Sequence, residues 1–330
     1  MALSEHQLRR ELSEAGIANA AIDAVWPDWW SDEAAQSPSA TAELTYTVAR
    51  RLGLSPKTLF DGSAQFLWRD DTKFKNLGTA SEREQEIIAA FGVAVGRSAV
   101  RATKVGPRSN LPDAVTLRET ILAQNRLVDA AELLNFCWAF GIPVIQLRLF
   151  PLRQKRMHAM TIKSDGRYAI LLGFETRYWA RIAYIIAHEV AHILLGHLAD
   201  SGSLLEIDDP LDLQDPDEEE AQADALALTL LTGSPNVQVT ANVSSYTATQ
   251  LADAAMRQAP GSRIEPGILA LCLGHSTDKW RQSFGALKII PPGEAQVADQ
   301  INELAAMQFD WQALSYDSQE YLSRVIGRWE

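Results

Sequence analysis

Two histidines and a glutamate stand at the spacing of a metal-binding helix in the middle of the chain. His188, Glu189 and His192 complete the pattern H-E-x-x-H. On an α-helix, residues i and i+4 project only about 40° apart, so both imidazoles can reach one metal ion. Glu189 is turned by about 100° from His188, where it can act as general base toward a water molecule that the metal activates. We therefore predict one zinc ion held by the two histidines, with Glu189 as the catalytic residue.

The helix that carries this motif is expected to run over residues 176–195 and to end at Gly196. It is apolar on nearly every side, which is typical of a buried helix. Its apolar residues are Trp179, Ile182, Ile185, Ile186, Val190, Ile193 and Leu194. Buried histidine and glutamate side chains without partners would be costly, so the pattern favours a metal site over an ordinary exposed helix.

A catalytic zinc ion usually takes three protein ligands, and two residues compete for the third place. His197 follows His192 by five residues and lies just beyond Gly196, about 140° away on a continued helix, so it could reach back only through a special turn. Glu220 opens a second amphipathic helix, with Asp224 one turn later on the same face. Glu220 is the better candidate for the metal, and Asp224 could accept the outer N–H of a ligating histidine. We expect that removing His197 leaves the metal in place.

The residues around both helices resemble a known family. They are G-I-P-V at 141–144, H-E-V-A-H-I-L-L-G-H at 188–197 and E-A-Q-A-D-A-L-A-L-T-L-L at 220–231. Together they resemble the ImmA/IrrE family of bacterial zinc metallo-endopeptidases, of the gluzincin type, whose second helix reads E-x-x-A-(N/D)-x-F-A-x-x-L-L-x-P. This chain departs from that pattern at Leu226, where phenylalanine is usual, and at Thr232 and Gly233, where Met-Pro is common. The resemblance covers about residues 128–235.

The resemblance implies a cytoplasmic endopeptidase that cleaves a transcriptional repressor or an antitoxin, often of helix-turn-helix type, in a stress, mobile-element or phage-defence response. It also implies that nucleic acid could serve as an activating signal, and it implies no membrane partner. The alternative is a DNA-binding transcriptional regulator or an antitoxin-like interaction module with a non-proteolytic metal site. A structural zinc site usually has four ligands rich in cysteine, and neither Cys137 nor Cys272 lies near the motif in the sequence.

The helices and strands expected around these residues indicate an α+β fold that is mostly helical. Short β-like runs occupy residues 142–147, 158–163 and 168–172, and an Asp-Gly turn joins the last two into a hairpin. We expect a zincin-like core in which this small sheet packs on the motif helix and on the second, Glu220-bearing helix. The predicted division is a helical N-terminal region at 1–115, the metallopeptidase core at 116–235 and a helical C-terminal region at 236–330.

The N-terminal region is expected to be helical, with helices over residues 5–24 and 81–102, and a further helix is expected over 117–140 at the start of the predicted core. A helix, a glycine turn and a second helix over 48–60 resemble the helical pairs of helix-turn-helix regulators, so this region is a helix-turn-helix-like or a sensor or partner domain. Arg97, Arg101, Lys104 and Arg108 form a basic cluster, which we interpret as a solvated helix face rather than a phosphate-binding patch.

Charge is divided unevenly along the chain, whose net charge is −12. Residues 1–160 carry 19 Lys and Arg against 18 Asp and Glu, whereas residues 161–330 carry 11 against 24. Much of the acid lies at 200–224, and we expect 201–219 to form a mobile flap with almost no apolar anchor. No signal peptide or membrane span is evident, and two cysteines in apolar surroundings predict buried free thiols, so we expect a cytoplasmic protein.

A peptidase also needs a group that stabilises the oxyanion formed at the attacked carbonyl. Four polar residues are candidates: His158, Tyr168, Tyr178 and His275. The sequence gives no reason to choose among them.

Overall fold

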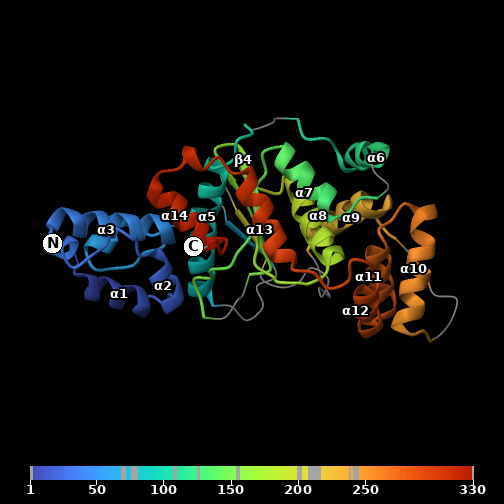
Figure 1. The fold of residues 1–330 in the computed structure, drawn as a ribbon, viewed down its shortest axis with the longest axis horizontal. Helices are drawn as coiled ribbons and strands as arrows, with labels where there is room; N and C mark the ends of the chain where they lie inside the picture. The colour runs from blue at the N-terminus through green and yellow to red at the C-terminus, as the bar shows by residue number, and fades with distance from the viewer. Residues whose placement is uncertain are drawn as a thin grey trace.

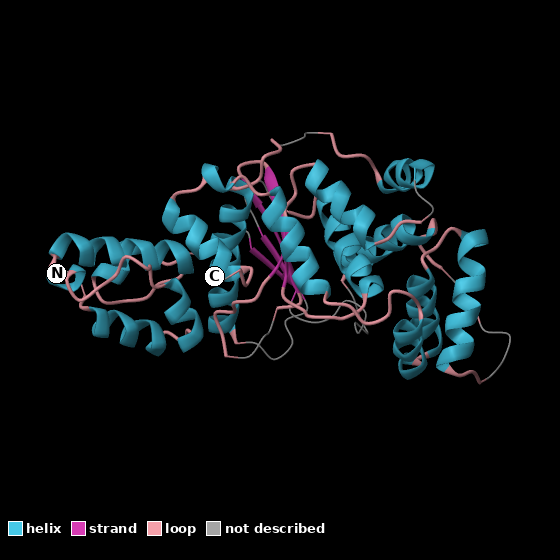
Figure 2. Cartoon of the chain, in the orientation of Figure 1, coloured by secondary structure: helices cyan, strands magenta, loops and turns pink. Residues whose placement is uncertain are grey.

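The computed structural model describes residues 3–67, 72–75, 81–106, 110–124, 127–153, 157–198, 203–206, 217–237, 239–240 and 245–328. Helices surround a single small sheet in the middle of an elongated molecule (Figure 1; Figure 2). The mostly helical α+β fold is thus confirmed. None of the helices in these ranges is long and apolar enough to cross a membrane.

The sheet has five strands in the order β1-β5-β3-β4-β2. Their bounds are β1 Thr72–Lys75, β2 Val144–Gln146, β3 Ala159–Ser164, β4 Arg167–Leu172 and β5 Ser203–Glu206. β3 and β4 form the predicted hairpin, whose turn places Asp165 at φ 53° and Gly166 at φ 72°. β2 is parallel to β4, β5 is antiparallel to β3, and β1 is parallel to β5. β1 and β5 were not predicted.

Side chains alternate across the sheet and so contribute to two separate hydrophobic cores. Ala159, Ile170 and Leu204 lie in one core with helices α7 (Ala130–Ala139) and α8 (Trp179–Leu195). Met160, Leu171 and Leu205 lie in the other core with α5 (Glu82–Arg101). The buried strands therefore place α8, which carries the H-E-x-x-H motif, on one face and α5 on the opposite face.

Helix α5 lies unusually close to the sheet because it presents glycine there. A Cβ atom at Gly92 would stand 2.2 Å from the sulfur of Met160, and one at Gly96 would stand 2.5 Å from Cγ1 of Ile162. Ser81 and Glu84 form the predicted capping box at the start of this helix. Although α5 falls within the predicted N-terminal region, it covers one face of the sheet; the division at 115 and 235 stays a prediction.

Helix α9 (Glu218–Thr232) packs along α8 and brings its acidic first turn beside the motif. The expected helix over 117–140 is wrong as one element, because it divides into α6 (Ala114–Gln124) and α7. Beyond α9, helices α10 (Ala248–Ser262), α11 (Pro266–Thr277) and α12 (Trp280–Ile289) pack on one another at one end of the molecule (Figure 1).

The other end of the molecule is built from α1 (Glu5–Glu14), α2 (Asn19–Val25), α3 (Pro38–Leu52) and α4 (Pro56–Phe60). The single helix predicted over 5–24 is wrong, because Gly16 adopts φ 99° and breaks it in two. The predicted corner at 48–60 is present: Gly53 at φ 69° ends α3, and a Cβ there would lie 2.3 Å from the carbonyl oxygen of Ala90. DNA binding by this corner stays a prediction.

The acidic segment is anchored to the sheet at one point. Leu204 and Leu205 of β5 are fully buried, one in each core, so the expectation that residues 201–219 lack an apolar anchor is wrong at these positions. The segment 207–216, which carries much of the acid, lies outside the described residues.

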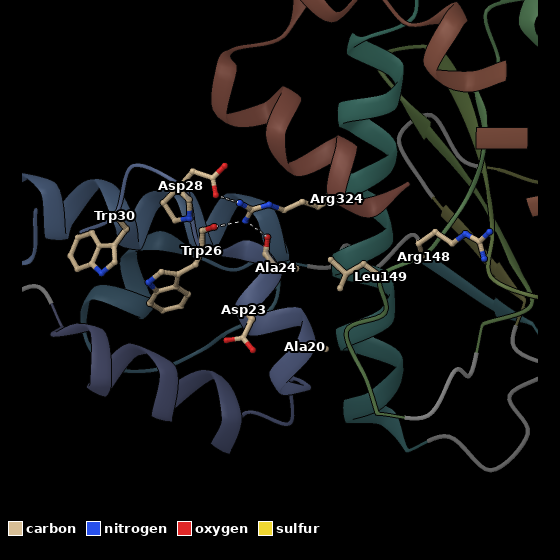
Figure 3. A pocket seen from close by; sticks show the side chains of 10 residues that line it. Ala20, Asp23, Ala24, Trp26, Asp28, Trp30, Arg148, Leu149 and Arg324 are labelled. Carbon is tan, nitrogen blue, oxygen red and sulfur yellow. Dashed lines mark hydrogen bonds and ion pairs between the residues drawn. The ribbon is translucent and has the colours of Figure 1, made fainter. Parts of the chain in front are cut away.

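The C-terminal helices α13 (Val297–Gln308) and α14 (Tyr316–Val325) return to the sheet and the N-terminal helices. Arg324 of α14 donates hydrogen bonds to the carbonyl oxygens of Ala24 and Trp26 at the end of α2 and pairs with Asp28 (Figure 3). It also pairs with Glu320, one turn earlier on α14. We call this cluster the arginine junction. It lies beside a cavity of about 570 Å³.

Candidate metal centre

His188, His192 and Glu220 converge where the last turns of α8 meet the first turn of α9. Nε2 of His188 lies 3.0 Å from Nε2 of His192 and 3.3 Å from Oε2 of Glu220. Oε1 of Glu220 lies 3.5 Å from Nε2 of His192. One ligand atom from each residue therefore lies within 4.8 Å of the others, and all three side chains are fully buried. This group could hold a metal ion.

Local structure explains why Glu220 enters the group. Asp217 is the N-cap of α9, and its carboxylate accepts a hydrogen bond from the backbone N–H of Glu220 at 3.0 Å. The cap fixes the first turn, in which Glu218 and Glu219 are more exposed than Glu220. The acidic turn thus serves both as a favourable helix start and as the source of one inward-facing carboxylate.

The surroundings of these atoms fit a bound cation. The convergent atoms are imidazole nitrogens and a carboxylate, which are ordinary ligands of a divalent metal. Oε1 of Glu220 is buried and accepts no hydrogen bond from the part of the chain that the structure describes. Burying a carboxylate in this way is costly unless a positive charge compensates it.

The outer nitrogen of His188 is held by a carboxylate. Nδ1 of His188 lies 2.9 Å from Oδ1 of Asp224, and the hydroxyl of Tyr184 donates to the same oxygen at 2.6 Å. This arrangement leaves Nε2 of His188 turned toward the other two members of the group. Asp224 therefore lies where its spacing predicted. Tyr184 was not predicted as a site residue, although it precedes His188 by one helical turn and so shares its face.

The outer nitrogen of His192 is held by the other candidate, His197. The two Nδ1 atoms are 2.8 Å apart, and Nε2 of His197 lies 3.3 Å from Oε1 of Gln222 on α9. If His192 keeps the lone pair on Nε2 for a metal, its Nδ1–H donates to His197, which in turn donates from Nε2 to Gln222. His197 thus lies behind His192, outside the ligand group. The chain turns back there because Gly196 adopts φ 72°.

Glu189 also lies beside the group without belonging to it. Its side chain is fully buried, and the hydroxyl of Thr161 on β3 donates a hydrogen bond to Oε2 of the carboxylate. Thr161 faces the α8 side of the sheet, as its neighbour two residues earlier, Ala159, does. Thr161 was not predicted as a site residue, although a threonine inside a buried strand indicates that its hydroxyl has a buried partner.

The four candidates for stabilising the oxyanion contact residues outside the ligand group. His158 stacks on Phe174, Lys163 lies over the ring of Tyr168, and His275 meets Trp280 edge to face. The hydroxyl of Tyr178 lies 3.2 Å from a carboxylate oxygen of Glu294, and both burial and that carboxylate raise the pKa of the tyrosine. The structure brings none of the four into the ligand group.

The two cysteines are free thiols, as predicted, and neither is in the ligand group. Burial raises the pKa of both thiols, that of Cys272 to about 12. They therefore remain protonated at neutral pH and are poor nucleophiles and poor metal ligands.

Comparisons of the chain with protein-family models, with curated proteins and with solved structures find no significant match. The geometry of the α8–α9 centre therefore carries the functional argument by itself.

Proposed function

We propose that this protein is a zinc-dependent metallo-endopeptidase whose metal ligands are His188, His192 and Glu220. One observation carries the proposal: two histidines one helical turn apart meet a glutamate from a second helix, with Glu189 next to the first histidine. Three protein ligands leave one coordination position for water or substrate, as catalytic zinc sites require. The four-ligand arrangement of a structural zinc site is not formed by the described residues.

When bound, zinc would supply a Lewis acid that polarises a peptide carbonyl and makes a water molecule nucleophilic. Glu189 would remove the proton from that water and deliver it to the leaving amine. Thr161 would hold the Glu189 carboxylate in one orientation through its hydroxyl. Asp224 and His197 would fix the two imidazole rings so that each presents Nε2 to the metal.

The substrate belongs to the same proposal and rests on the resemblance to the ImmA/IrrE family. A cytoplasmic enzyme of that kind would cleave a helix-turn-helix repressor or an antitoxin during stress, mobile-element activity or phage defence. Nucleic acid is proposed as an activating signal on the same ground. The three metal-ligand side chains are fully buried, which supports the need for some signal before a peptide can reach them.

The decisive experiment replaces the proposed base and keeps the metal ligands. The substitution Glu189→Gln preserves the shape of the side chain but removes its ability to take a proton. The neighbouring genes would be read for a small helix-turn-helix protein, this candidate would be co-expressed with the protein, and cleavage would be followed by mass spectrometry of the fragments. Glu303→Gln, on the exposed side of α13, is the matched control.

We expect Glu189→Gln to retain one zinc ion per chain and to lose cleavage, whereas Glu303→Gln retains both. Loss of zinc together with cleavage would make Glu189 a ligand or a structural residue. Undiminished cleavage by Glu189→Gln would refute the mechanism.

A further inference from the structure

A second polar site lies on the other side of the sheet, where α3, α5 and α14 meet (Figure 1). It is a cleft of about 270 Å³ that is partly enclosed by the turn after α3 and the start of α14. Four arginines of the described part of the chain line it: Arg50 and Arg51 at the end of α3, and Arg97 and Arg101 one turn apart on α5. We call it the arginine cleft.

Among the described residues that line the arginine cleft, positive charge exceeds negative charge. Asp317 is the single carboxylate of this described set, and it already pairs with Arg50 and Arg51. The exposed side chains of Arg97 and Arg101 form no hydrogen bond or ion pair with the described residues. Nε of Arg51, which is almost fully buried, donates no hydrogen bond within the same part of the chain. Guanidinium donors are thus left over for a ligand.

Arg97 and Arg101 differ from other exposed arginines of the N-terminal helices and α5. Arg9, Arg10 and Arg83 each pair with a carboxylate. Arg97 and Arg101 instead face a concave surface beside two other arginines. Guanidinium groups in such an array suit the several oxygens of a phosphate, which they can bind in pairs.

The other residues that line the cleft limit the kind of molecule that could bear the phosphate. Leu67 is an exposed large apolar residue, 54% accessible, and with Pro56 and Val93 it gives the cleft an apolar rim. A volume of about 270 Å³ is near the lower end for small-molecule pockets and is too small for a folded partner. Charged donors beside an apolar rim match a ligand with phosphates at one end and a ring at the other.

We propose that the arginine cleft is a nucleotide-binding site, in which Arg97 and Arg101 bind the phosphates and the rim around Leu67 contacts the base. This proposal is independent of the peptidase activity, because the cleft is lined by α3, α5 and α14 whereas the metal centre belongs to α8 and α9. It also revises our interpretation of the basic cluster, since two of its arginines line a cleft rather than an evenly solvated helix face.

The test measures binding of ADP, of inorganic pyrophosphate and of a single-stranded oligonucleotide to the full-length protein by calorimetry. The double variant Arg97→Gln with Arg101→Gln removes the proposed phosphate ligands and should fold, because both side chains are exposed. The matched control, Arg257→Gln with Arg281→Gln, removes the same charge from exposed positions on α10 and α12. The thermal midpoint of each variant verifies that it is folded.

We expect saturable binding of ADP that weakens as salt is raised, since phosphate contacts are electrostatic. The cleft variant should bind ADP about a hundredfold more weakly, about tenfold for each charge-assisted contact, and the control variant should bind it normally. Absence of ADP binding would overturn the proposal, and so would equal weakening in both variants. Binding of the oligonucleotide but not of ADP would overturn it in favour of a nucleic-acid site.

Discussion

The arginine junction and the metal centre both bury charged groups that connect distant parts of the chain, but they balance those charges differently. At the junction, Arg324 is 7% accessible and meets two backbone carbonyls and the carboxylates of Asp28 and Glu320. At the metal centre, two imidazole nitrogens and a carboxylate meet one another. The junction pairs its buried cation with carboxylates of the same chain, whereas the buried carboxylate of Glu220 lies beside imidazoles in a group that could hold a metal ion.

This difference predicts how each region responds to perturbation. Removing Arg324 leaves buried acceptors without a donor, so this substitution should lower the free energy of unfolding. Removing a ligand from the metal centre should first lower the metal affinity. It should lower the free energy of unfolding only as far as bound metal stabilises the fold. Four predictions test the comparison, beginning with the largest expected effect.

Glu220→Ala should give the largest effect, because loss of one of three ligands should weaken zinc binding by several kcal/mol. The variant should come out of dialysis against a mild chelator without metal and without activity. Elemental analysis measures the metal, and thermal unfolding with and without chelator measures its stabilising effect. Wild-type protein should lose stability with chelator and Glu220→Ala should not respond. If the variant retained one zinc ion per chain, Glu220 would not be a metal ligand. The comparison between the metal centre and the arginine junction would then fail.

Arg324→Met should lower the free energy of unfolding by about 3 kcal/mol, because a buried charged network loses its central member. Urea unfolding followed by circular dichroism measures this loss. Zinc content should be unchanged, since the junction lies away from α8 and α9. Arg177→Met is the control: its side chain is 74% exposed and its pair with Glu294 should contribute less than about 1 kcal/mol. Equal effects of the two substitutions would mean that the junction is no more than a surface ion pair.

Asp224→Ala and His197→Ala should each weaken zinc binding about 10–100-fold, as expected when the partner of a ligating histidine is lost. For His197 this differs from the expectation drawn from sequence, in which the residue is a bystander. Competition with a chromophoric chelator measures the affinity. His275→Ala, on α11, is the control histidine. An unchanged zinc affinity in His197→Ala would restore the bystander interpretation.

Thr161→Val should give the smallest effect, because it removes one hydrogen bond to Glu189 and preserves the shape of the side chain. We expect full zinc content and kcat reduced about threefold to tenfold, with little change in KM. Thr161→Ser retains the hydroxyl and should restore most of the rate. A loss of zinc in Thr161→Val would show that the threonine supports the fold of the centre rather than the orientation of the base.

Local sequence patterns predicted the motif helix, the β3–β4 hairpin and the positions of Glu220 and Asp224, because each depends on spacing along one element. These patterns were wrong where a single glycine, or a contact between residues far apart in the sequence, decides the local structure. Gly16 breaks a helix whose apolar periodicity continues on both sides, and Leu204 and Leu205 are hidden within an acidic segment. Thr161 acquires its contact with Glu189 only when α8 packs on β3. His197 reaches His192 through the left-handed turn at Gly196 and reaches Gln222 only when α8 meets α9.

The order of the elements along the chain gives the metal centre a further property. His192 and Glu220 lie on either side of β5 in the sequence, so an ion bound by both would close the intervening chain into a ring that includes this strand. Unlike a disulfide, the ion would bind the folded arrangement and not the unfolded chain, so its binding free energy would stabilise the closed ring. Removal of the ion would open the ring, and the pairing of β5 with β3 would then rest on four residues of strand and the burial of two leucines. Metal occupancy and the integrity of that side of the sheet should therefore rise and fall together.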